Sequence, residues 1–397
     1  MSQFINLMND RIYAKSVIFY SFILAISILT LFLSHYEYEG KNTIVLVLQK
    51  RRKKIISYIQ VIGLLISFVT LWFVSAFADC GTDRETYGLI FSNVTIQDLF
   101  SGWQEPGFIL FNMFFRIFGK NPRIIYIAIS TVTLLLLYLT WYKLRNDILI
   151  GYGVLAFTMM FYVQSLSLMR IYMASALLFC GVDYLRKGEY IKYAILILIT
   201  TLIHYSTLLM ILPYLIMIFL ENKRYRKYVL NILVIILLVL FLLALVIGAP
   251  ILSSIPIFAR FQRYLQNVSF SNIGIMQFIY NIPICALVFI AYYLTESKRE
   301  QNMLIAYTGS VFFYSLLSYG IQVMGRVNSL FSILYFFLIP MCMKKIKDYF
   351  IERGENGRII YWILSFLVIG YYIFRFAIYI GEYWELDSVI PYRNILF

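Results

Sequence analysis

The sequence predicts an all-α polytopic membrane protein with about twelve transmembrane helices, and two observations support this fold class. Hydrophobic residues make up 61% and aromatic residues 18% of the 397 residues, and the mean hydropathy of +0.79 is far above that of a soluble domain. Apolar runs close to the ~20 residues that cross a bilayer recur along the whole chain. No polar stretch is long enough for a soluble domain, so residues 1–397 are predicted to form a single integral membrane domain.

Positive charge sets the predicted topology. Much of the basic charge (net +14) lies in six short clusters between apolar runs, which indicates orientation in a lipid bilayer and not binding to nucleic acid. If all six clusters face the cytoplasm, an even number of spans must separate each neighbouring pair. The clusters lie at residues 50–54, 143–145, 186–192, 223–227, 298–299 and 344–347. Twelve apolar runs meet this condition and leave both termini outside: 15–33, 55–77, 123–142, 149–167, 169–185, 190–204, 206–220, 229–248, 275–295, 303–320, 326–343 and 358–378.

Two segments need a separate argument. Residues 190–220 are long enough for one helix, but one helix would place a basic loop outside, so two short spans that turn at residues 204–206 are predicted. Residues 107–119 are apolar but only 13 long, which favours an interfacial or re-entrant helix on the outer face. The larger outer-face loops are then residues 78–122 and 249–274.

Arginine dominates the cations of the predicted outer face, whereas lysine is concentrated in the cytoplasmic clusters. Some of these arginines can simply extend toward lipid headgroups. The guanidinium fork also binds phosphate oxygens in a bidentate manner and keeps its charge when desolvated. An outer cavity lined by arginine therefore suggests a phosphorylated or pyrophosphorylated lipid as ligand. The candidate pyrophosphate contacts are Arg84, Arg170, Arg260, Arg263 and Arg326.

Acidic, histidine and aromatic residues of the same face are the other candidates. Asp83, Glu105 and His204 are candidate general bases for a hydroxyl nucleophile, although carboxylates can equally pair with the arginines and hold the loops. Aromatic residues in the outer loops are candidates for stacking on sugar rings, with packing and the interfacial belt as the alternative. These aromatic residues are Tyr87, Trp103, Tyr205 and Tyr392.

Several enzyme classes find no support in the sequence. No phosphate-binding glycine-rich loop, HExxH, GxSxG or CxxC motif is present, which argues against ATP-driven transport and against zinc or serine hydrolysis. The four cysteines are scattered without disulfide or metal-ligand spacing.

Five short motifs follow one another along the chain in a characteristic order. They are Gly81-Thr82-Asp83 with Tyr87, Glu105-Pro106-Gly107-Phe108, Arg170 at the start of a helix, His204-Tyr205-Ser206, and Pro391-Tyr392-Arg393. Over roughly residues 55–393 this order resembles the EpsG family of bacterial exopolysaccharide proteins, which belongs with the Wzy-type polysaccharide polymerases. One position departs from the family pattern, because Ile171 follows Arg170 where the family usually has glutamine.

The resemblance implies a polymerase with a GT-C-like architecture on the outer, periplasmic or extracellular side of the bacterial plasma membrane. Such a polymerase transfers the growing chain from its lipid carrier to the non-reducing end of a new undecaprenyl-pyrophosphate-linked oligosaccharide repeat unit. Undecaprenyl pyrophosphate is released, and the product is exopolysaccharide, capsule or O-antigen. A chain-length regulator and a flippase are the partners that this role implies. Because mechanisms of this class need not use a cation, the resemblance also implies neither a required metal nor another cofactor.

Three other functions stay open. A polysaccharide ligase would use the same donor and the same arginines. A polyprenyl-phosphate-sugar glycosyltransferase would typically carry an acidic pair in its first outer loop, which Asp79 and Asp83 could form, and would need a divalent cation. A flippase should carry charge through the middle of its spans, whereas the charges here gather at the predicted outer ends.

Overall fold

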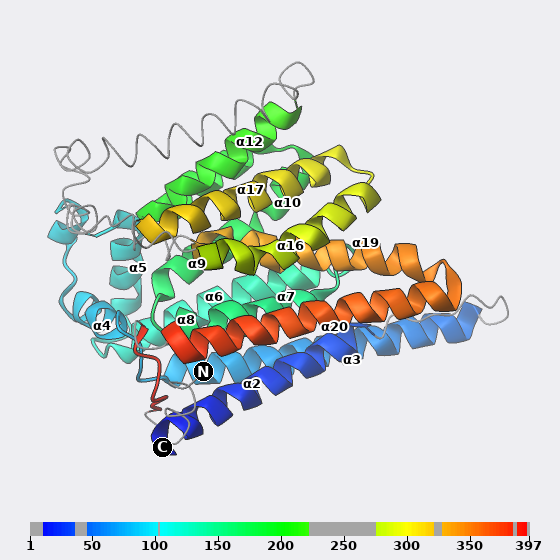
Figure 1. Cartoon of the computed structure of the whole chain (residues 1–397). Helices are drawn as coiled ribbons and strands as arrows, with labels where there is room; N and C mark the ends of the chain where they lie inside the picture. Colours follow the sequence, from blue (N-terminus) through cyan, green and yellow to red (C-terminus); the bar gives the residue numbers. More distant parts are fainter. Residues whose placement is uncertain are drawn as a thin grey trace. The chain divides into compact units, whose positions relative to one another are not determined.

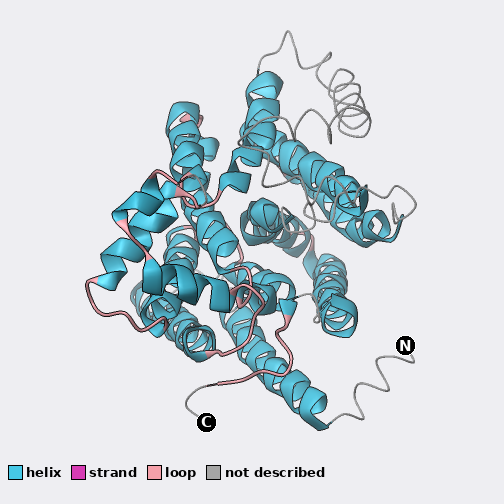
Figure 2. Ribbon diagram, turned by 90° about the vertical axis from the view of Figure 1, so that its left-hand side faces the viewer, coloured by secondary structure: helices cyan, strands magenta, loops and turns pink. Residues whose placement is uncertain are grey.

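The computed structural model describes residues 11–35, 46–101, 104–221, 275–320, 328–383 and 387–394. The regular structure within these ranges is helical (Figure 2), and their extended backbone pairs only in an isolated bridge between Ala78 and Asn394. The all-α prediction is thereby confirmed for the described residues. The predicted loop 249–274 and the predicted span 229–248 lie outside them.

Five helices within the described ranges are long and apolar enough to cross a membrane. They are Ile12–Leu29, Tyr58–Phe77, Arg123–Lys143, Ser329–Ile351 and Gly354–Gly381, and each coincides with a predicted span. Four further predicted spans correspond to shorter apolar helices, at Ile150–Ser165, Tyr190–Thr201, Tyr205–Glu221 and Ile279–Leu294. The count of twelve spans and the GT-C-like arrangement stay predictions.

The chain divides into two compact units. Unit 1 comprises Met1–Thr95, Ile109–Cys180 and Tyr335–Phe397, and unit 2 comprises Ile96–Phe108 and Gly181–Leu334. The predicted span 169–185 is divided at Gly181, where α9 ends and α10 begins. That the two units together form a single membrane domain stays a prediction.

Unit 1 is a bundle of long helices (Figure 1). Helix α6 packs against α3 and α9, α2 packs against α3 and α7, and α19 packs against α7 and α20. The elements are α2 (Arg11–His35), α3 (Leu46–Phe77), α4 (Arg84–Asn93), α6 (Arg123–Lys143), α7 (Ile150–Ala156), η2 (Phe157–Tyr162), α8 (Val163–Ser165), α9 (Met169–Cys180), η7 (Leu334–Leu338, which begins at the unit boundary), α19 (Ile339–Ile351), α20 (Gly354–Ile378) and η8 (Tyr379–Tyr383).

Hydrogen bonds between helices lock this bundle, as expected where lipid supplies no hydrophobic drive between helices. The buried hydroxyl of Tyr162 donates to the carbonyl of Leu71 at 2.7 Å. The Trp141 indole, which has no exposed surface, donates to the carbonyl of Phe336 at 3.0 Å. Each bond connects segments far apart in the sequence and thereby fixes their register.

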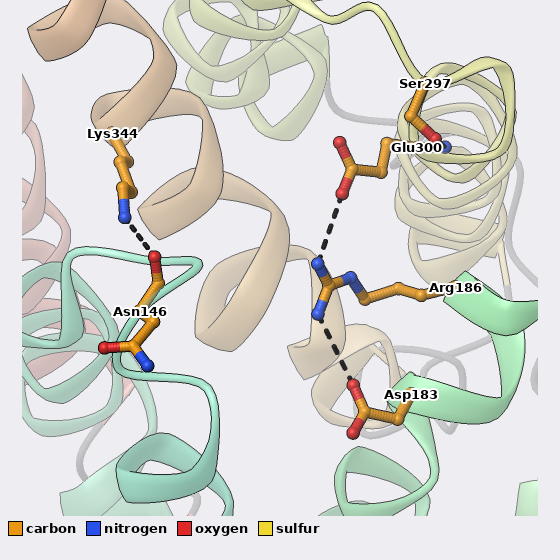
Figure 3. Close-up of polar contacts among 6 residues, drawn as sticks. All are labelled: Asn146, Asp183, Arg186, Ser297, Glu300 and Lys344. Atoms are coloured by element: carbon orange, nitrogen blue, oxygen red, sulfur yellow. Dashed lines mark hydrogen bonds and ion pairs between the residues drawn. The ribbon is translucent and has the colours of Figure 1, made fainter.

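Segments far apart in the sequence meet at both ends of unit 1, and the side of the membrane that each end faces stays a prediction. At one end, the Lys344 ammonium donates to the carbonyl of Asn146 (Figure 3), and Leu149 N–H donates to the carbonyl of Pro340. Lys344 belongs to the basic cluster 344–347 and Asn146 follows the cluster 143–145, and both clusters are predicted to be cytoplasmic. At the other end, the segment that follows α3 meets the C-terminal segment in the bridge between Ala78 and Asn394.

Unit 2 contains the predicted turn at residues 204–206. Helix α11 ends at Thr201, His204 adopts an extended backbone with φ −151° and ψ 112°, and η3 begins at Tyr205. The rings of Tyr193 and Tyr214, which lie on opposite sides of the turn, have centroids 6.5 Å apart. The chain therefore folds back on itself here, as two short helices and not one long one. The elements of unit 2 are η1 (Ile96–Leu99), the first part of α5 (Pro106–Arg116), α10 (Val182–Lys187), α11 (Tyr190–Thr201), η3 (Tyr205–Met210), α12 (Ile211–Glu221), α16 (Ile275–Leu294), α17 (Lys298–Gly320) and η6 (Asn328–Phe331).

Three loops of unit 2 that are predicted to be cytoplasmic are tied together by charge. Arg299 donates to Glu221 at 2.7 Å and to the carbonyl of Lys187 at 3.0 Å. Arg186 points between Asp183 and Glu300 and lies 3.4 Å and 3.5 Å from their carboxylates (Figure 3). The C-terminal ends of α10 and α12 and the N-terminal end of α17 therefore lie at one end of unit 2.

The predicted interfacial segment 107–119 forms α5, an 11-residue helix. At ~1.5 Å per residue it is roughly 16 Å long, about half of the bilayer core. Its length agrees with an interfacial or re-entrant helix, and its depth in the membrane stays a prediction.

Candidate functional site

The loop that follows α3 is held by residues 387–394, which we call the C-terminal strap. Asp79 N–H donates to the Arg393 carbonyl at 2.7 Å, Gly81 N–H to the Ser388 carbonyl at 3.1 Å, and Thr82 N–H to the Asp387 carbonyl at 2.9 Å. The strap thus fixes the backbone immediately before Asp83.

Gly81 brings this loop against the turn that precedes α9. Its φ of +116° lies in a region that residues with a Cβ rarely adopt, and a Cβ here would lie 2.7 Å from the carbonyl oxygen of Leu166. Only glycine therefore permits the approach. The consequence is that the loop carrying Asp83 lies beside the segment that carries Arg170.

Asp83, Tyr87 and Arg170 form what we call the unit 1 cluster. The guanidinium carbon of Arg170 lies 5.1 Å from the centroid of the Tyr87 ring, within the range of a cation–π contact. The hydroxyl of Tyr87 lies 3.5 Å from Oδ2 of Asp83, a long hydrogen bond. Tyr87 is 3% exposed, so a buried ring lies between a cation and a carboxylate.

Arg84 and Tyr392 are anchored in the protein itself. Arg84 is 4% exposed, donates to the carbonyls of Ser75 and Ala76 at 3.3–3.4 Å, and lies 4.1 Å from the centroid of the Tyr126 ring. Burial lowers the pKa of the Arg84 guanidinium. The hydroxyl of Tyr392 donates to the carbonyl of Val74 at 3.1 Å, and burial raises the pKa of Tyr392 to about 12.

These contacts attach the loop and the strap to the helices of unit 1. The pyrophosphate role of Arg84 and the glycan role of Tyr392 stay predictions.

Glu105 and His204 form what we call the unit 2 pair. Oε1 of Glu105 lies 3.5 Å from Nδ1 of His204 and accepts the backbone N–H of Tyr205 at 3.3 Å. Glu105 is 6% exposed, and His204 is half-buried. The 3.5 Å separation is a close charge contact and not a hydrogen bond, since Nδ1 of His204 has no hydrogen-bond partner among the described residues.

Gly107 explains why these two residues meet although they are far apart in the sequence. The N–H groups of Gly107 and Phe108 both donate to the carbonyl of Leu202, at 2.8 Å and 3.3 Å. A Cβ at Gly107 would lie 2.8 Å from the same carbonyl oxygen. The close approach ties the start of α5 to the end of α11, and Glu105 and His204 flank this junction.

The model of one protein family matches residues 61–394, which include both groups of residues just described. The chain belongs to the EpsG family. EpsG proteins are Wzy-type polysaccharide polymerases, and the resemblance noted in the sequence is thereby confirmed. No curated protein and no solved structure gave a match.

Four other residues were expected to act in this EpsG protein. Trp103, Arg260, Arg263 and Arg326 lie outside the described residues. Among the described residues, no three His, Cys, Asp or Glu side chains gather as a metal site would require, and the expectation that the enzyme needs no metal stays a prediction.

Sequence reasoning missed the residues that position the two groups in this EpsG protein. Gly81 and Gly107 both lie inside the short motifs, so the sequence draws attention to them. The sequence does not predict which carbonyls they approach, those of Leu166 and Leu202. The pairing of the strap with residues 79–82 left no signal, because backbone hydrogen bonds do not depend on side-chain type.

Proposed function

We propose that the chain is a polysaccharide polymerase that joins undecaprenyl-pyrophosphate-linked oligosaccharide repeat units on the outer side of the bacterial plasma membrane. The product would be exopolysaccharide, capsule or O-antigen. The observation that carries the proposal is the EpsG match over residues 61–394, which spans the unit 1 cluster and the unit 2 pair. The apolar helices support a multi-pass membrane protein. A chain-length regulator and a flippase of the same pathway are the proposed partners.

The unit 1 cluster supplies the proposed pyrophosphate contact. Departure of undecaprenyl pyrophosphate leaves negative charge on the leaving group, and a fixed cation stabilises that charge without the need for a metal. Arg170 suits this role because stacking on Tyr87 engages the face of its guanidinium, while the N–H donors of such a group lie in its plane. Asp83 is then a candidate for positioning the acceptor. Arg260, Arg263 and Arg326 are proposed as further pyrophosphate contacts.

The unit 2 pair supplies the proposed base. Nε2 of His204 takes the proton of the acceptor hydroxyl, whose oxygen attacks the anomeric carbon of the donor. The bond from that carbon to the pyrophosphate oxygen breaks, and undecaprenyl pyrophosphate leaves with the bonding electrons. Glu105 stabilises the imidazolium that forms through its charge, since its carboxylate lies 3.5 Å from Nδ1 and is largely buried.

Glycan chain length in cells tests this function. Arg170→Ala should collapse the polymer ladder to single repeat units that still reach the outer face, while the membrane level of the protein is unchanged. Arg123→Ala is a matched control, because Arg123 directly follows the predicted outer-face loop 78–122 but belongs to neither group of residues. Loss of all outer glycan, with lipid-linked units trapped inside, would instead indicate a transporter.

A further inference from the structure

Asp387 is a buried carboxylate that the proposed mechanism does not use. It lies on the strap and is 5% exposed. Its Oδ2 accepts a hydrogen bond of 2.7 Å from the hydroxyl of Tyr379, in the element η8 that extends α20. Its backbone carbonyl accepts the N–H of Thr82 at 2.9 Å. One residue therefore connects the end of a long helix to the loop that leads into Asp83.

The neighbouring residue continues this connection. The carbonyl of Ser388 accepts the N–H of Gly81 at 3.1 Å, and Ser388 itself has a left-handed φ of 49°. Few residues other than glycine adopt such a φ, so the surrounding bonds must hold it. The hydrogen bond between the Asp387 carboxylate and Tyr379 restrains the residue directly before Ser388 and so helps to hold this φ.

We propose that Asp387 is a positioning residue for the unit 1 cluster, an inference that rests on the proposed polymerase function. Its carboxylate holds the strap against Tyr379, and the strap in turn holds Gly81 and Thr82. Because Asp83 follows Thr82 directly, a displaced strap moves the carboxylate that meets Tyr87 and releases the contact between Gly81 and Leu166. Arg170 keeps its stacking partner only while this chain of contacts is intact.

The chemistry of the pair supports a positioning role. Burial of a polar oxygen is costly unless a donor compensates it, and the Tyr379 hydroxyl is such a donor for Oδ2 of Asp387. With 5% exposure and Tyr379 on one oxygen, Asp387 is better placed to hold protein than to meet substrate.

The test compares Asp387→Ala, Asp387→Asn and Tyr379→Phe with the wild-type chain. The amide oxygen of asparagine can still accept the Tyr379 hydroxyl, so Asp387→Asn should keep polymer length and rate within about twofold. Asp387→Ala and Tyr379→Phe should lower the polymerisation rate at least tenfold, mainly through kcat. Glu85→Gln is a charge-matched control, since Glu85 is an exposed acid on α4.

Amide hydrogen exchange of the purified protein gives a second readout that needs no substrate. Asp387→Ala should speed exchange at Gly81 and Thr82 at least tenfold, with the central helices of unit 1 unchanged. Full activity of Asp387→Ala would overturn the inference. Equal inactivation by Asp387→Asn and Asp387→Ala would also overturn it, because the charge itself would then be required. If the wild-type protein makes no polymer, the proposed function fails, yet the exchange result still decides whether Asp387 holds the loop.

Discussion

At the residue scale, the contact between Glu105 and His204 shows how far a sequence can lead. Both residues were candidates because they are polar groups at predicted outer ends of apolar segments. Their pairing was not predictable, since it depends on the bonds from Gly107 and Phe108 to the Leu202 carbonyl. The same holds for Arg84, whose burial against two backbone carbonyls distinguishes it from Arg170 only in the structure.

The unit 2 pair leads to a graded prediction. His204→Ala should lower the polymerisation rate about 10²–10⁴-fold, the usual contribution of a general base. Glu105→Gln should cost less, because the amide oxygen can still accept the Tyr205 N–H but carries no charge to stabilise an imidazolium. Rates with a lipid-linked repeat unit measure both. A His204→Ala rate within twofold of wild type would remove His204 as the base.

Gly81 leads to a prediction with an internal control. Gly81→Ala should cost about 1–3 kcal/mol from the backbone conformation alone, and the contact with Leu166 adds to this. The expected result is a lower thermal midpoint in detergent together with shorter glycan. Gly370→Ala is the control, because no atom lies within 4 Å of a Cβ built there. Similar midpoints for the two variants would show that the close approach at Gly81 does not exist.

At the scale of elements, the apolar runs predicted most of the long helices but neither the short helix α4 nor the strap. The run 123–142 became α6, and the turn at residues 204–206 was predictable because one long helix would misplace a basic loop. Helix α4 was not predicted, since it is short and carries a mixture of polar and apolar residues. The strap was also missed as an element, because it pairs through its backbone.

The rate at which the Cys80 thiol is modified tests whether the strap is anchored. Burial raises the pKa of its thiol, and its residue is 8% exposed. Because the thiolate is the reactive form, Cys80 should react slowly with N-ethylmaleimide at neutral pH and faster as the pH rises. Tyr392→Ala should raise the rate at least fivefold, since Tyr392 bonds the strap to Val74. The Cys80→Ser variant gives the background from the other cysteines. An unchanged rate in Tyr392→Ala would contradict the anchoring role.

At the scale of the whole molecule, charge was the most informative part of the sequence. Within unit 1, the bond from Lys344 to Asn146 joins segments at two basic clusters that were assigned to one side. Within unit 2, Arg299 joins three such segments. The sequence could not supply the division into two units, because the boundaries at residues 95, 108, 180 and 334 follow from packing and show no change in composition.

The predicted orientation can be tested by thiol labelling in intact cells. In a background without cysteine, Lys120→Cys should react with a membrane-impermeant maleimide, because Lys120 is exposed and predicted to be outside. Glu355→Cys should react only after the membrane is permeabilised, since this exposed residue follows a basic cluster. The reverse pattern would invert the topology and place the proposed site in the cytoplasm.

Reconstitution of the purified protein in vesicles with a lipid-linked repeat unit tests the polymerase function most directly. The account predicts a ladder of polymer, release of one undecaprenyl pyrophosphate for each new linkage, and loss of both in Arg170→Ala. Repeat units that cross the vesicle membrane without being joined would contradict it.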